Sequence, residues 1–155
     1  MTELVQEIRE IAAQYPEARS AILPALHLAQ KRNDGWLPPQ ALEEVGTALG
    51  VTPAYVQSVA SFYDMLHLAP VGQHLVEVCT NICCGLEGAQ GVLEVFEQEL
   101  GVRAGQTTED GEITLRAVEC LGGCGWATIV AVDDHYRTHV RAEDVPAIVE
   151  ELTGG

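Results

Sequence analysis

The five cysteines of this 155-residue chain fall in two short segments, and this clustering constrains the fold more than any other feature. The first segment reads EVCTNICCGL, and the second reads VECLGGCGW. They contain Cys79, Cys83, Cys84, Cys120 and Cys124, with 35 residues between Cys84 and Cys120. In a reducing compartment, cysteines grouped in this way bind a metal or do redox work more often than they form structural disulfides.

The chain before the first cysteine segment is expected to be helical. Apolar residues recur there at helical spacing, and proline and glycine residues mark helix starts and stops. We expect helices over residues 3–13, 20–32, 39–49 and from residue 53 onward, the last carrying Val56, Val59 and Phe62. The Pro70-Val71-Gly72 run ends this pattern and predicts a domain boundary, with residues 1–70 forming a helical bundle.

Residues 71–155 show a mixture of strand and helix patterns. Alternating or short apolar runs predict strands over 74–79, 113–119, 128–132 and 136–140. Helices are predicted over 85–100 and 143–152. The buried face of the first of these is expected to carry Leu86, Val92, Leu93, Phe96 and Leu100. The chain as a whole is therefore predicted to have an α+β fold.

The predicted elements bring the two cysteine segments together. Cys79 and Cys120 each follow a strand, Cys84 begins a helix, and Cys124 closes a glycine-rich loop. Strand ends of one sheet can lie side by side, so thiolates from the two segments can form one metal site. The spacings are C-x4-C and C-x3-C if Cys84, rather than its neighbour Cys83, is the ligand. Spacing alone does not choose between these two.

Three chemistries use such cysteine pairs: a [2Fe–2S] cluster, a zinc ion or a redox-active dithiol. The surroundings favour the cluster. Glycines at 85, 122, 123 and 125 would let backbone amides approach the sulfurs. The helix that begins near Cys84 would also turn its positive end toward the anionic site.

Charge and hydropathy exclude several classes of function. The net charge is −15, from 23 acidic and 8 basic side chains, which disfavours a nucleic acid or an anionic membrane as partner. No leader segment or apolar run of about 20 residues is seen, so a cytoplasmic location without membrane insertion is expected. No glycine-rich dinucleotide motif follows a strand, so NADH is not expected to bind to this chain.

The cysteine motifs resemble the thioredoxin-like [2Fe–2S] subunit of respiratory complex I, which is the 24 kDa or E-type family of NADH–quinone oxidoreductase. The similar runs are CTNICC and VECLGGC, with weaker support from ALHLAQ, GWL and VASFY further upstream. The resemblance implies an N-terminal helical bundle followed by a thioredoxin-like [2Fe–2S] ferredoxin domain over 71–155. It also implies four cluster ligands, Cys79, Cys84, Cys120 and Cys124, which leaves Cys83 spare.

In function, the resemblance implies an electron-transfer subunit of an NADH–quinone oxidoreductase, peripheral to the inner membrane and not catalytic alone. Its cluster would exchange electrons with FMN on a partner flavoprotein subunit that also binds NADH. The alternatives are the equivalent subunit of an NAD-linked hydrogenase or formate dehydrogenase, and a zinc-stabilised interaction module. One departure stands out: Trp126-Ala127-Thr128 replaces the Thr-Ala-Pro run that is usual in the family.

Overall fold

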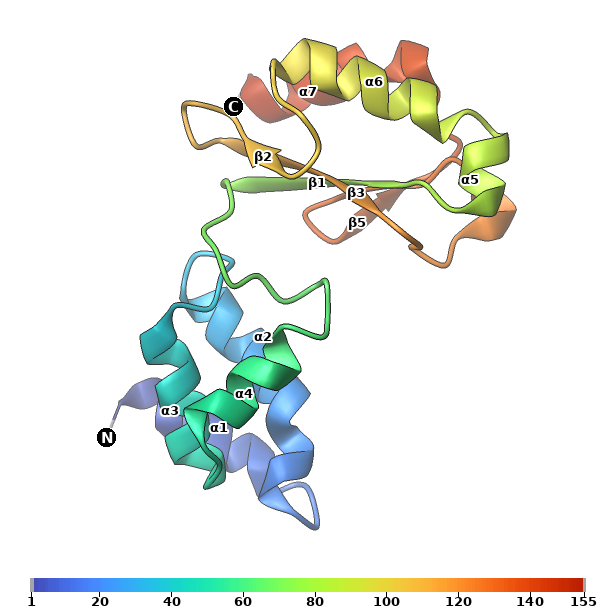
Figure 1. Cartoon of the computed structure of the whole chain (residues 1–155). Coiled ribbons are helices and arrows are strands. Elements are labelled where there is room, and N and C mark those ends of the chain that lie inside the picture. Colours follow the sequence, from blue (N-terminus) through green and yellow to red (C-terminus); the bar gives the residue numbers. More distant parts are fainter. Residues whose placement is uncertain (1, 155) are drawn as a thin grey trace. The chain divides into compact units, whose positions relative to one another are not determined.

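A computed structural model describes residues 2–154, in which helices come first and a five-stranded sheet follows (Figure 1). The chain divides into two compact units, Met1–Pro70 and Val71–Gly155. Each unit has its own buried apolar cluster. This order of elements confirms the expected α+β fold class. None of the helices in the described part of the chain has both the length and the apolar character needed to cross a bilayer.

The first unit is a bundle of short helices. They are α1 (Glu3–Ala12), the 3-10 helix η1 (Ala18–Ala21), α2 (Ile22–Arg32), α3 (Pro39–Leu49) and α4 (Pro53–Ala60). Threonine side chains cap α1 and α4, and Gly50 ends α3 in the left-handed region, with φ of 70°. The bundle core includes the fully buried Ile8, Leu26 and Val45.

Two expectations for this unit were wrong. The helix expected over 20–32 begins at Ile22, because Ser20 lies inside the 3-10 helix that precedes α2 and does not cap it. The fourth helix was expected to carry Phe62 but ends at Ala60, so Phe62 lies beyond it and is 80% exposed. The Phe62 ring instead packs edge-on against Tyr63, with centroids 5.1 Å apart.

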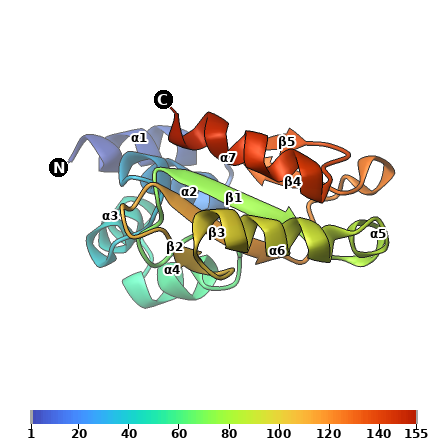
Figure 2. The same cartoon turned by 90° about the horizontal axis from the view of Figure 1, so that it is seen from above.

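The second unit is a sheet covered on one face by helices. Its elements are β1 (His74–Cys79), α5 (Ile82–Leu86), α6 (Ala89–Leu100), β2 (Gln106–Thr107), β3 (Ile113–Val118), η2 (Cys124–Trp126), β4 (Val130–Val132), β5 (His135–Arg137), η3 (Ala142–Asp144) and α7 (Val145–Thr153). The strand order is β2-β3-β1-β4-β5. The β1–β3 pair is parallel, and the other neighbours are antiparallel. Helices α6 and α7 lie side by side over the sheet (Figures 1 and 2).

The expected long helix over 85–100 is in fact two helices. Gly88, with φ of 94°, separates α5 from α6 and turns the chain between them. As a result Leu86 is 83% exposed, which contradicts its expected place on the buried face. The last two strands are also shorter than expected, at Val130–Val132 and His135–Arg137, and the short strand β2 had not been expected.

Candidate metal centre

The two cysteine segments meet at one end of the sheet, where β1 and β3 finish. In this parallel pair Cys79 lies opposite Val118, so Cys120 follows only two residues beyond the strand end. The Thr80 amide and hydroxyl both donate to the carbonyl of Val118, at 3.0 and 3.1 Å. Strand pairing therefore holds the start of one cysteine segment directly against the other.

Helix α5 carries the next two cysteines at this end of the sheet (Figure 1). Asn81 caps the helix, and its side-chain oxygen accepts from the Ile82 amide at 2.6 Å. Cys83 and Cys84 are adjacent in the helix, so their side chains point about 100° apart. Cys84 is 2% exposed and packs with Cys79 and Ile129, whereas Cys83 is exposed.

The second cysteine segment is held in place by backbone and side-chain contacts. The Gly122 amide donates to the Cys120 sulfur at 3.3 Å, and Gly122 has φ of 75°, a conformation that favours glycine. The Tyr136 hydroxyl on β5 donates to the Leu121 carbonyl at 2.5 Å. Glycine thus brings an amide to a sulfur, as expected, while a strand from the far side of the sheet anchors the loop.

The segment after Cys124 closes the site against α5. Thr128 is 1% exposed, and its hydroxyl lies 3.4 Å from the carbonyls of both Cys84 and Glu87 at the end of that helix. The Ile129 carbonyl accepts from the Cys79 amide at 3.1 Å. The two cysteine segments are therefore joined by contacts that do not involve their thiols.

The thiols influence one another's pKa values. Burial raises the pKa of Cys84, a hydrogen bond from the Ile129 amide opposes this, and the neighbouring Cys79 and Cys124 raise it further. The pKa of Cys124 is raised chiefly by a hydrogen bond with the Cys83 side chain and by the charge of that thiol, with smaller contributions from Cys120 and Cys79. The pKa values of Cys84 and Cys124 are therefore each affected by thiols of both cysteine segments.

The donor set of this group fits a [2Fe–2S] cluster. The cluster takes two thiolates on each iron and is stabilised by amide hydrogen bonds to sulfur. The Gly122 amide already donates to the Cys120 sulfur, and the Ile129 amide acts to lower the pKa of Cys84. Among residues 2–154, no three His, Cys, Asp or Glu side chains are arranged to hold a single metal ion.

Sequence reasoning did not identify Thr128, Tyr136 and the Ile129 amide as parts of this site. The only signal for Thr128 was its place in the run that departs from the family pattern. Tyr136 lies on the short strand β5, where it is opposite Ala131 of β4. Sequence periodicity does not predict this pairing. The effect of Cys83 on the pKa of Cys124 could not be foreseen either, because it depends on how α5 and η2 pack.

The surface beside the thiols carries three large apolar side chains. Ile82 is 74% exposed, Leu86 83% and Trp126 60%. Trp126 follows Cys124 in η2, and its carbonyl accepts from the amide of His139 at 2.9 Å. It is therefore not a packed core aromatic, and its ring lies at the surface near the cysteines.

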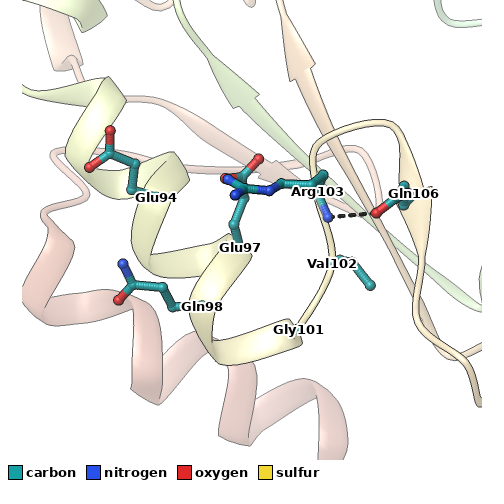
Figure 3. Close-up of a pocket in the computed structure, with 7 residues that line it drawn as sticks. All are labelled: Glu94, Glu97, Gln98, Gly101, Val102, Arg103 and Gln106. Atoms are coloured by element: carbon teal, nitrogen blue, oxygen red, sulfur yellow. Dashed lines mark hydrogen bonds and ion pairs between the residues drawn. The ribbon is translucent and has the colours of Figure 1, made fainter.

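A pocket of about 590 Å³ lies elsewhere in this unit, at the carboxyl end of α6 (Figure 3). Two of its charged groups bind each other, since Arg103 pairs with Glu97 at 2.7 Å, and the Arg103 amide donates to Gln106 at 2.9 Å. The cysteines lie beyond the opposite end of α6, next to α5 (Figure 1). This pocket is therefore separate from the candidate metal centre.

Comparison with known proteins relates the chain to one family. The model of the thioredoxin-like [2Fe–2S] ferredoxin family matches residues 8–153. The chain is 43% identical over 147 residues to the second E-type NADH-quinone oxidoreductase subunit of Rhizobium meliloti. The aligned residues make up 95% of this chain and 87% of that relative. It is 40% identical over 145 residues to the E-type NADH-quinone oxidoreductase subunit of Rickettsia conorii, covering 92% and 87%.

Among solved structures, the fold resembles part of a larger protein, an NAD+-reducing [NiFe]-hydrogenase in its H2-reduced state. The TM-score is 0.75 at 22% identity, over 86% of this chain and 22% of that chain. The air-oxidised state of such a hydrogenase gives a TM-score of 0.74 at 21% identity. At this level of identity the likeness concerns the fold alone.

Proposed function

Because this chain belongs to the thioredoxin-like [2Fe–2S] ferredoxin family, we propose that it is the electron-transfer subunit of an NADH–quinone oxidoreductase. Its partner would be the flavoprotein subunit, which holds FMN and binds NADH. As part of that complex it would lie on the cytoplasmic side, peripheral to the inner membrane. The relatives from Rhizobium meliloti and Rickettsia conorii support this assignment, since they match nearly the whole chain.

The observation that carries the proposal is that the two cysteine segments meet at one end of the sheet, where the Gly122 amide donates to the Cys120 sulfur. We propose that the ligands are Cys79, Cys84, Cys120 and Cys124. When bound, the cluster supplies one-electron redox chemistry. The protein residues bind it as thiolates, donate hydrogen bonds from Gly122 and Ile129, and hold the two segments together through Thr80 and Thr128.

The ligand choice between the adjacent cysteines can be tested with a matched pair of variants. Cys84→Ser should lose most of the bound iron, because the buried thiol beside Cys79 is removed. Cys83→Ser should keep it, because the exposed thiol is not a ligand. The measurement is iron, sulfide and zinc content after anaerobic purification, together with visible absorption and the EPR signal after dithionite. Retention of iron in Cys84→Ser and its loss in Cys83→Ser would overturn the assignment.

The same measurements separate the other functions that the sequence left open. A colourless protein with stoichiometric zinc would be a zinc-stabilised module without redox activity. To test the partner, NADH should reduce the EPR-active cluster only when the flavoprotein subunit is co-purified with the chain. Co-purification with hydrogenase or formate dehydrogenase subunits instead would favour those complexes.

A further inference from the structure

The Tyr136 hydroxyl and the Cys120 sulfur bind opposite sides of one peptide group. The hydroxyl donates to the Leu121 carbonyl at 2.5 Å, and the amide of the next residue, Gly122, donates to the Cys120 sulfur at 3.3 Å. This carbonyl and this amide belong to the same planar peptide group, in which C=O and N–H point in opposite directions. A side chain on β5 is therefore connected to a proposed ligand through a single peptide group.

The register of the sheet places Tyr136 on the face from which it reaches this peptide group. Val130 and Val132 of β4 are buried in the core cluster that also contains Phe96 of α6. Ala131, between them, faces the other side of the sheet, because side chains alternate along a strand. Tyr136 is opposite Ala131 in the antiparallel pair, so these two side chains lie on the same face. Tyr136 therefore lies on the sheet face that is turned away from α6.

The strand that carries Tyr136 is held by contacts in which no cysteine takes part. It pairs with β4 along its whole length. Arg137, the next residue, pairs with Glu151 on α7 at 2.5 Å. On the other side, the Nδ1 atom of His135 lies 2.7 Å from the carbonyl of Asp133 in the preceding turn. The sheet thus sets the position of the Tyr136 hydroxyl independently of the cysteine loop.

A hydroxyl fixed in this way affects the hydrogen bond to sulfur by two routes. Because the peptide group is planar, holding its carbonyl also sets the direction of its N–H. Because hydrogen bonds in a chain polarise one another, donation to the carbonyl makes the amide of the same group a stronger donor. Hydrogen bonds to the sulfurs help to set the reduction potential of an iron–sulfur cluster. Reduction adds negative charge, so a stronger donor favours the reduced state.

We propose that Tyr136 is a positioning residue for the metal centre. Its hydroxyl orients and polarises the Leu121–Gly122 peptide group, strengthens the hydrogen bond to the Cys120 sulfur, and so raises the reduction potential of the cluster. This inference rests on the proposed function, because it takes Cys120 as a ligand. Tyr136 acts through the peptide group and not by its own contact with the cluster.

Tyr136→Phe tests the proposal, because it removes the hydroxyl and keeps the ring. The reduction potential should become more negative, measured by EPR during a dithionite titration with redox mediators. We expect the reduction equilibrium to change by about two- to tenfold, which is about 18–59 mV, since a tenfold change is 59 mV for one electron. Far-UV circular dichroism checks that the variant folds. An unchanged potential overturns the proposal.

Thr153→Val is the matched control for the loss of a hydroxyl. The Thr153 hydroxyl also donates to a backbone carbonyl of the second unit, that of Val149 at 2.9 Å, but it does so on α7, which carries no cysteine. This variant should therefore keep the native potential. An equal shift in Thr153→Val and Tyr136→Phe would show that the effect is a general result of lost stability, and it too overturns the proposal.

A second measurement needs no iron, so it can fail while the proposed function stands. In the full-length, cluster-free chain, NMR gives the ¹³C shift of the Leu121 carbonyl and the ¹H shift of the Gly122 amide. Both should move upfield in Tyr136→Phe, because their hydrogen bonds are lost or weakened, while the amide of Phe96 keeps its shift. Unchanged shifts at Leu121 and Gly122 overturn the proposal. A native chain without iron would overturn the proposed function, and these shifts would still decide whether Tyr136 orients and polarises the peptide group.

Discussion

At the scale of single residues, Gly122 does two things in the second cysteine segment. Its amide donates to the Cys120 sulfur, and its φ of 75° turns the chain between Cys120 and Cys124. A residue with a side chain loses about 1–2 kcal/mol in this left-handed conformation, because its Cβ approaches the following carbonyl oxygen. Gly122 therefore combines a structural constraint with direct contact to a proposed ligand.

We expect Gly122→Ala to lower the free energy of unfolding by about 1 kcal/mol and to shorten the lifetime of the visible absorption in air. Gly125→Ala is the matched control, because an added Cβ at Gly125 meets no atom within 4 Å and its φ is not positive. Urea unfolding followed by circular dichroism gives the first quantity. Equal effects of the two substitutions would contradict the role given to Gly122.

At the scale of elements, sequence patterns predicted strands and helices well where burial is regular. The strand over 74–79 and the helix α3 with its glycine stop appear as expected, because periodic burial and a left-handed cap act locally. The pattern over 85–100 missed the break at Gly88, since apolar residues continue in phase on both sides of it. Phe62 was misassigned for a similar reason: it continues a helical spacing past the point where the helix ends.

The candidate site could be predicted only in part. Its location followed from cysteines placed directly after two strands, because parallel strand ends meet at one edge. The family and its [2Fe–2S] cofactor, inferred from the cysteine motifs, are confirmed. The ligand set stays a prediction. The contributions of Thr128 and Tyr136 depend on pairing between distant segments, which no local pattern encodes.

One contact between elements should make stability depend on pH. Glu97 on α6 accepts from the Ala104 amide at 3.0 Å and pairs with Arg103, which lies beside it (Figure 3). These contacts lower its pKa below the ordinary 4.5. A lowered pKa in the folded state stabilises the protein above pH 4.5, and this stability is lost as the pH falls through the folded value.

Glu97→Gln should therefore flatten the fall in melting temperature between about pH 6 and pH 3, because the neutral amide can still accept from Ala104 but does not titrate. Glu94→Gln removes the same charge from the same helix and leaves the Ala104 contact intact, so it should keep the native slope. Thermal unfolding at several pH values checks this. Parallel curves for Glu97→Gln and the native chain would refute it.

At the scale of the whole molecule, the two compact units have separate cores. The first is built on residues such as Leu26, and the second on residues such as Phe96, both fully buried. All five cysteines belong to the second unit. We propose that the units 1–70 and 71–155 unfold as separate domains, with the cluster reporting on the second alone.

Leu26→Ala should destabilise the first unit by about 2–5 kcal/mol, the usual cost of a cavity at a fully buried leucine. The urea midpoint of the visible absorption should stay unchanged, while part of the far-UV signal is lost at lower urea. Phe96→Ala alters the core of the second unit instead, so it should shift the urea midpoint of the visible absorption. If Leu26→Ala moves both signals together, the two units do not unfold separately.

The parallel pairing of β1 with β3 has a consequence for how such chains can vary in length. The two cysteine segments are brought together by strand register and not by the 35 residues that separate Cys84 from Cys120. Insertions or deletions in the connection between α6 and β3 would leave the thiols in place. One residue added between Val118 and Cys120 would turn that thiol to the other side of the extended chain. Length variation among related chains should therefore fall in that connection and avoid the two short intervals between paired cysteines.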